Sequence, residues 1–358
     1  MKLLVFGANS QLGLELTALL AKSGIDHATL ATDEVDILNA KEVVKAVSRI
    51  NPTQLINVST YGNLQKAEGD AAAAKRCDLV NTDGVTALAR VCEQLAIPML
   101  HHSSSYVFDG QKKDTYLEDD ETNPTCRYGR SKWYGERSLR EETERHIILR
   151  TDWLFSLHRD FYFRDLVSTC KKQKGKLGVV DNRFSPTFAG DAARVILAIV
   201  KQVDCNAQAW GTYHYNAMQP VNQDQFVQMV LEECAKHDPA LAKVMPDLKI
   251  EPLPVEAPYI RNSALNCEKL LYNFGIKQRS RGPGTIQVLE AIYGVKPKAK
   301  APEKKPVAKA DTDMPPEPIP APAMTRARPA TPPKAAKAPK RQKRPARKAA
   351  TRKASPSP

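Results

Sequence analysis

The sequence predicts an α/β fold, namely a Rossmann-type doubly wound parallel sheet with a smaller C-terminal lobe and a disordered basic tail. Three observations predict this class. Short apolar runs alternate with amphipathic stretches through residues 1–150, a glycine-containing turn follows the first apolar run, and the composition changes abruptly after residue 295. Alternating strands and helices are typical of parallel sheets that helices cover on both faces.

Five short apolar runs are predicted as the strands of this sheet: residues 2–6, 27–32, 54–58, 98–103 and 146–150. Between them lie amphipathic patterns with the helical period: one that follows Gly13 and runs through about Lys22, and two at residues 40–50 and 71–95. Residues 1–150 are therefore expected to form one domain, whose core sheet is extended by later segments.

The order of elements becomes less regular after Arg150. Helices are predicted at residues 161–174, 190–203 and 223–236, and short strands at residues 177–180 and 212–215. We interpret residues 151–295 as a smaller, substrate-binding lobe.

The positive charge of the chain is concentrated in residues 296–358. This segment holds 18 of the 53 Lys and Arg residues, 4 of the 40 Asp and Glu residues and 15 of the 26 prolines, but no aromatic residue. Such a composition cannot bury enough apolar surface to offset the entropy of ordering, so a disordered tail is predicted. Without aromatic residues or a folded reader, the tail is expected to contact polyanions only non-specifically.

The seven cysteines are odd in number, are widely spaced and never form a Cys-x-x-Cys pair. This pattern indicates neither a disulfide framework nor a metal site, and it fits a reducing compartment. The apolar run at the N-terminus is far too short for a signal peptide, and nowhere do about eighteen apolar residues run together. We therefore expect a cytoplasmic protein with no membrane partner.

The first motif is the turn Gly7-x-x-Ser10-x-x-Gly13 between a predicted strand and a predicted helix. Gly7 permits a tight turn, Gly13 permits close packing of helix on strand, and the start of the helix offers N–H groups to a pyrophosphate. An ordinary strand-to-helix connection has the same spacing, so the context must decide.

A second motif supplies that context. Tyr128 and Lys132 are spaced to lie one turn apart on one face of a helix, where the cation is expected to lower the pKa of the phenol and so promote proton exchange. A predicted strand ends in Ser103-Ser104-Ser105, whose hydroxyls can donate to the same substrate oxygen. Alternatively, Tyr128 and Lys132 are a surface helical pair and the serine run is a polar loop.

Nine blocks of the chain match one family: residues 7–13, 35–37, 80–81, 104–110, 128–136, 150–155, 185–187, 211–214 and 261–266. With them, nearly all of residues 1–294 resembles the dTDP-4-dehydrorhamnose reductases, which are extended short-chain dehydrogenase/reductases. The resemblance implies that NADPH or NADH delivers hydride to the 4-keto group of a dTDP-6-deoxy-hexulose, converting dTDP-4-dehydrorhamnose to dTDP-L-rhamnose.

The resemblance also implies a role for each site residue. Tyr128 is expected to donate the proton, Lys132 to tune it and to hold the nicotinamide ribose, and Ser104 to stand where the family has Thr. The substrate is expected to contact Ser104, Ser105, Trp153 and Arg261, the last through its diphosphate. The residues expected to bind the cofactor are Gly7, Ser10, Gln11, Leu12, Gly13, Asp36, Ile37, Thr60, Tyr61, Gly62, His102, Tyr128 and Lys132.

Three positions depart from the family pattern: Ser10 replaces Gly, Ser105 replaces Asp, and Ala31 replaces a common Asp. An acid at the end of the second strand repels a 2′-phosphate, so Ala31 predicts that NADPH binds at least as well as NADH, unless Asp33 reaches the ribose. A non-catalytic nucleotide-binding regulatory subunit of the same family, or a reductase or epimerase of another nucleotide sugar, stays open as an alternative. So does a homodimer.

Overall fold

The computed structural model describes residues 1–31, 34–35, 37–158 and 161–295. All of them belong to one compact unit, Met1–Ala299. The predicted tail, residues 296–358, lies outside the described residues.

A six-stranded parallel sheet forms the centre of the unit, with the strand order β10-β5-β4-β3-β1-β2. Its members are β1 (Lys2–Phe6), β2 (Asp26–Leu30), β3 (Gln54–Asn57), β4 (Met99–Ser104), β5 (His146–Thr151) and β10 (Gly211–Tyr215). The five strands predicted in the first half of the chain are confirmed, with ends that shift by one or two residues. Strand β1 pairs with β2 on one side and with β3 on the other, so the direction of chain progression reverses there.

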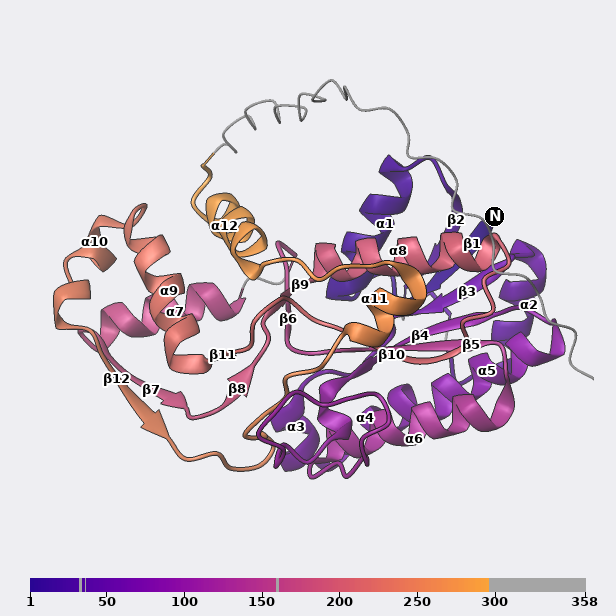
Figure 1. The fold of residues 1–358 in the computed structure, drawn as a ribbon, viewed down its shortest axis with the longest axis horizontal. Helices are drawn as coiled ribbons and strands as arrows, with labels where there is room; N and C mark the ends of the chain where they lie inside the picture. The colour runs from indigo at the N-terminus through magenta and orange to yellow at the C-terminus, as the bar shows by residue number, and fades with distance from the viewer. Residues whose placement is uncertain (32–33, 36, 159–160, 296–358) are drawn as a thin grey trace, which may run out of the picture. The chain divides into compact units, whose positions relative to one another are not determined.

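Helices cover both faces of the sheet, as the doubly wound class requires (Figure 1). Leu3 and Val5 of β1 pack with α1 (Gln11–Lys22), α8 (Ala189–Asp204) and α11 (Glu268–Phe274). Leu4 and Phe6 point to the opposite face and pack with α2 (Ala40–Ile50), α5 (Gly84–Gln94) and α6 (Arg127–Glu142). The strands are apolar at successive positions because both of their faces are buried.

The helix predicted at residues 71–95 is interrupted. The chain forms α3 (Leu64–Gly69) and α4 (Ala71–Asp78), passes through the π-helical turn Leu79–Asp83, and continues as α5. Single π turns inside helices are frequent at functional sites. This one carries the buried Asn81, whose contacts are described below.

The second half of the chain builds a lobe with its own core. Phe155, Phe163, Phe184 and Phe226 lie at its centre. Its main elements, gathered at one end of the ribbon in Figure 1, are α7 (Phe161–Lys172), β7 (Lys176–Val180), α9 (Gln223–Ala235), α10 (Pro239–Ala242), β12 (Lys249–Leu253) and α12 (Arg281–Ile292). Two-residue strands link the lobe to the sheet domain: β6 (Leu154–Phe155) with β9 (Thr187–Phe188), and β8 (Arg183–Phe184) with β11 (Val221–Asn222).

Two predicted elements of this lobe return to the main sheet. Strand β10 pairs with β5 at the sheet edge, and α8 packs beside α1. These are the later segments that extend the core sheet, while the boundary between domains at residue 150 stays a prediction.

A buried ion pair fixes α6 against the sheet. Arg150 of β5 donates from Nε and Nη2 to the two carboxylate oxygens of Glu136 at 2.8 and 2.7 Å, and Arg140 adds a third bond at 2.8 Å. These cations hold the pKa of Glu136 down at about 2 despite its burial. This ion pair helps to position Tyr128 and Lys132, because both residues lie on α6.

Within the described ranges, no helix is both long and apolar enough to cross a membrane.

Candidate active site

A pocket of about 260 Å³ opens at the carboxyl ends of the central strands. Its walls come from the segments that follow β1, β3, β4 and β5, where ligands bind in open α/β sheets. Nine of the predicted site residues line it: Ser10, Gln11, Leu12, Thr60, Gly62, His102, Ser104, Tyr128 and Trp153. The structure therefore brings together the glycine turn after β1, the serine run at the end of β4 and Tyr128 of α6.

The turn after β1 is as tight as its glycines predict. Gly7 has a φ of +85°, and a Cβ there would lie 2.5 Å from the backbone nitrogen of Ser59. A Cβ on Gly13 would lie 2.2 Å from the carbonyl oxygen of Gly7. Ser10 has extended backbone, with a φ of −74°, and its Oγ caps α1 by accepting the Gly13 N–H at 3.0 Å. A serine is thus accommodated at position 10 as a favoured helix cap.

Asn81 holds the cofactor-side loop that follows β3. Its Oδ1 accepts the backbone N–H of Tyr61 at 2.9 Å, and its Nδ2 donates to the Tyr61 carbonyl at 3.1 Å. The same Nδ2 reaches Ser131 Oγ, at 3.0 Å, on the helix of Tyr128 and Lys132. Asn81 therefore ties this loop to α6. The sequence contained it as part of a matching block but gave it no role.

The remaining cofactor-side residues lie around the end of β2. Ile37 is buried in the core beside Gly84. Asp33 and Asp36 lie outside the described residues. Ala31 donates its backbone N–H to Glu34 Oε2 at 2.7 Å. A carboxylate therefore lies beside position 31, where the family commonly has Asp.

Tyr128 is buried on α6 with its ring edge-on to Tyr106, at a centroid distance of 5.9 Å. Burial raises the pKa of Tyr128 to about 12, although hydrogen bonding with Ser104 and Thr60 lowers it. The expected lowering of this pKa is therefore wrong: the cost of desolvating a phenolate outweighs the stabilising contacts. The phenol keeps its proton at neutral pH.

Lys132 is fully buried one turn further along α6. Its Nζ donates to the backbone carbonyl of His102 at 2.6 Å. Burial lowers the pKa of Lys132 to about 8, and Glu136 opposes this shift. His102 Nε2 lies 2.8 Å from Thr151 Oγ1. Burial lowers the pKa of His102 to about 3, so its ring is neutral.

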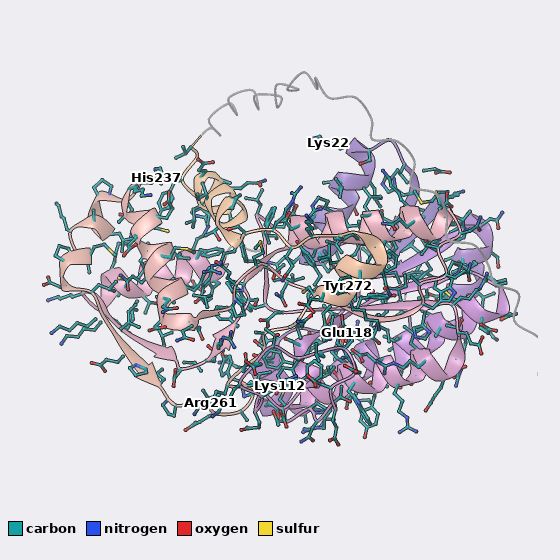
Figure 2. The ribbon with its side chains drawn as sticks, in the orientation of Figure 1. Lys22, Lys112, Glu118, His237, Arg261 and Tyr272 are labelled. Carbon is teal, nitrogen blue, oxygen red and sulfur yellow. The ribbon has the colours of Figure 1, made fainter. Side chains whose placement is uncertain are left out.

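Three residues predicted to contact the substrate, Trp153, Ser105 and Arg261, lie in different surroundings. The ring of Trp153 lines the pocket and packs on Tyr162 at a centroid distance of 4.8 Å, so it serves both the wall and the core. Ser105 is buried behind the wall and donates to Asp152. Arg261 lies outside the pocket on an exposed segment, 3.7 Å from a carboxylate oxygen of Asp181 (Figure 2).

Six lining residues were not predicted: Val58, Leu64, Tyr106, Thr151, Asp152 and Leu154. Tyr106, Asp152 and Leu154 directly adjoin predicted site residues in the sequence, whereas the other three do not. Asp152 stands between two residues of a matching block and, among the residues that the structure describes, is the one carboxylate on the wall of this pocket. In the part of the chain that the structure describes, no cluster of His, Cys, Asp and Glu side chains has the arrangement of a metal site.

Comparison with known proteins places this geometry in a family. A family model described as the RmlD substrate binding domain matches residues 1–293. The dTDP-4-dehydrorhamnose reductase of Sinorhizobium fredii is 30% identical over 294 residues, which cover 82% of this chain and 98% of that protein. The enzyme of that name from Aggregatibacter actinomycetemcomitans is 32% identical over 286 residues, covering 77% of this chain and 94% of the relative.

Solved structures agree with this assignment at the level of the fold. A dTDP-4-dehydrorhamnose reductase from Clostridium acetobutylicum has a TM-score of 0.71 at 24% identity and covers 82% of this chain and 99% of that one. A reductase of the same name from Bacillus anthracis, in complex with NADP, has a TM-score of 0.68 at 23% identity, over 80% of this chain and 98% of that one. With the match over residues 1–293, the chain belongs to the family of the dTDP-4-dehydrorhamnose reductases.

Proposed function

We propose that this protein is an NAD(P)H-dependent reductase of the 4-keto group of a dTDP-6-deoxy-hexulose, converting dTDP-4-dehydrorhamnose to dTDP-L-rhamnose. The observation that carries the proposal is the position of Tyr128. The protonated phenol of Tyr128 lines the same pocket as Ser10, Gln11 and Leu12 of the glycine turn. The proposal draws its substrate from the names of the curated relatives.

The residues of the turn fit a dinucleotide. A Cβ at position 7 or 13 would clash with backbone atoms, so the two glycines permit the tight turn, and α1 begins there with the positive end of its dipole, which favours a bound anion. Ser10, Gln11 and Leu12 would hold the pyrophosphate, and Thr60 to Gly62 would line the nicotinamide half. When bound, the reduced nicotinamide supplies a hydride to the substrate carbonyl carbon.

Tyr128 is assigned as the general acid. As negative charge develops on the carbonyl oxygen, its O–H transfers the proton that turns the oxygen into an alcohol. The Ser104 hydroxyl is assigned as a second donor to that oxygen, consistent with its hydrogen bonding to Tyr128. The Lys132 ammonium stabilises the phenolate that remains, because an opposite charge nearby favours the ionised form.

Turnover assays test this function. The full chain is expected to oxidise NADPH or NADH when a panel of 4-keto nucleotide sugars is supplied, with dTDP-4-dehydrorhamnose among the best substrates. Activity on a different 4-keto sugar alone would reassign the substrate but keep the chemistry. Tight cofactor binding without any oxidation of the cofactor would favour the regulatory-subunit hypothesis over the reductase.

Cofactor choice gives a separate prediction. Ala31 favours tolerance of a 2′-phosphate, whereas the carboxylate of Glu34 at the end of β2 opposes it by charge repulsion. Glu34→Gln is therefore expected to shift the ratio of the Kd values for NADH and NADPH about fivefold in favour of NADPH, a size typical of one solvent-exposed charge. Titrations at low ionic strength measure it, with Glu93→Gln on the exposed surface of α5 as control. An unchanged ratio would remove Glu34 from the ribose site.

A further inference from the structure

Asp152 occupies a position in the fold that points at the substrate. Thr151 of β5 is the register partner of Ser104 in β4, so Asp152 follows the strand end beside Ser105. Asp152 lines the same pocket as Ser104, Tyr128 and Trp153. A carboxylate therefore stands on the wall that carries the proposed proton donor.

Three segments of the chain fix this carboxylate in one orientation. Ser105 Oγ donates to Oδ1 at 3.0 Å, the backbone N–H of Ser185 donates to Oδ2 at 2.5 Å, and Ser263 Oγ donates to Oδ2 at 3.1 Å. The backbone N–H of Trp153 also favours the ionised form. With 4% of its surface exposed and both oxygens hydrogen-bonded, the carboxylate of Asp152 is held in place.

The charge of Asp152 has no cation beside it among the residues that the structure describes. No Lys or Arg lines the pocket, and the donors to the carboxylate are hydroxyl and backbone groups. Burial raises the pKa of Asp152 to about 6, but the group is still mainly ionised at pH 7.5. The pocket wall thus presents an uncompensated negative charge where the dielectric is low.

We propose that Asp152 is a substrate-binding residue that selects a neutral, hydroxyl-bearing sugar and rejects a sugar that carries a carboxylate. This inference rests on the proposed function, because it assumes that the pocket holds a nucleotide sugar. A hydroxyl donates to the ionised acid, which is a charge-assisted bond, whereas a uronate meets a like charge in a site that water screens poorly.

A purely structural role makes a different prediction. If Asp152 only held Ser105, Ser185 and Ser263 together, its loss would disorder the pocket wall. The affinities for neutral and anionic sugars would then fall by the same factor. The ratio of the two affinities therefore separates selection from scaffolding, and the absolute affinities do not.

The test measures binding of dTDP-glucose and dTDP-glucuronic acid to the full chain saturated with NADP⁺, by calorimetry at pH 7.5. These ligands differ by one carboxylate. The wild type is expected to bind the neutral sugar at least tenfold more tightly, Asp152→Asn to bring the ratio below about threefold, and Asp152→Glu to keep the preference. Asp165→Asn removes an exposed charge from α7 of the same lobe and should leave the ratio unchanged.

Three results would overturn the inference: no preference in the wild type, an unchanged ratio in Asp152→Asn, or an equal change in Asp165→Asn. The wild-type ratio decides even if Asp152→Asn fails to fold. Because binding is measured without turnover, the outcome is independent of the assay for the reductase. Discrimination without turnover would refute the proposed reaction alone, whereas turnover without discrimination would refute the role of Asp152 alone.

Discussion

Tyr128→Phe is expected to lower kcat for reduction of the keto sugar by about a hundredfold to ten-thousandfold, the range for loss of a positioned general acid. The ring and its edge-on contact with Tyr106 are retained, so the pocket should keep its shape. Cofactor affinity should change little, because the glycine turn supplies most of the binding surface. Steady-state rates and cofactor titrations of the same preparation measure the two effects.

Tyr106→Phe is the matched control. It removes a second phenol from the same pocket, and burial raises the pKa of that phenol well above its ordinary value. The control should lose far less activity than Tyr128→Phe, since the proposed mechanism assigns proton transfer to Tyr128 and not to Tyr106. If Tyr128→Phe reduced the sugar as fast as the wild type, the proton would come from another group.

Lys132→Met is expected to lower kcat/KM at least about a hundredfold and to weaken cofactor binding as well. The ammonium is assigned both to the phenolate and to the nicotinamide ribose, so both functions are lost together. Thermal stability should fall only slightly. Methionine fills a similar volume, and removing a buried charge offsets the loss of the bond to the His102 carbonyl. Glu136 keeps its two arginine partners.

Lys112→Met provides the comparison for the loss of a lysine. Lys112 pairs with Asp120 at 2.5 Å on the surface, away from the pocket lining. It should leave kcat and cofactor affinity unchanged. If the Lys132→Met variant bound cofactor like the wild type but turned over slowly, Lys132 would have a role in proton transfer and none in binding the nicotinamide ribose. A variant with wild-type kcat/KM would exclude it from the mechanism.

The parts of the fold that follow from local pattern were predictable from the sequence. Strand β1, the turn from Gly7 to Gly13 and helix α1 are adjacent in the chain, and each has its own signal: apolar continuity, two glycines and a helical period. The Tyr128 and Lys132 pair was visible for the same reason, since one helical turn separates them.

The parts that depend on distant contacts were not predictable in this way. Asp152 is held by Ser185 and Ser263, and Asn81 acts on Tyr61 and Ser131, so their roles exist only once the chain has folded. The return of β10 to the edge of the sheet has the same origin. It was assigned to the lobe because its neighbours in the sequence belong there.

The pKa of Tyr128 shows where spacing misleads. The four-residue spacing indicates how far apart the phenol and the ammonium lie along the helix, but it does not indicate the burial of either group. Desolvation raises the pKa of Tyr128 to about 12 and lowers that of Lys132 to about 8. A protonated tyrosine suits an enzyme that works in the direction of reduction, because the acid must carry its proton when the carbonyl arrives.

Oxidation of NADPH and NADH by the full chain in the presence of dTDP-4-dehydrorhamnose, measured in parallel for Tyr128→Phe, decides whether the protein is a reductase. We expect the wild type to consume one reduced nicotinamide for each dTDP-L-rhamnose formed and the variant to lose at least about ninety-nine per cent of this rate while still binding the cofactor. Cofactor binding by both proteins with no consumption by either would rule out the reductase reaction.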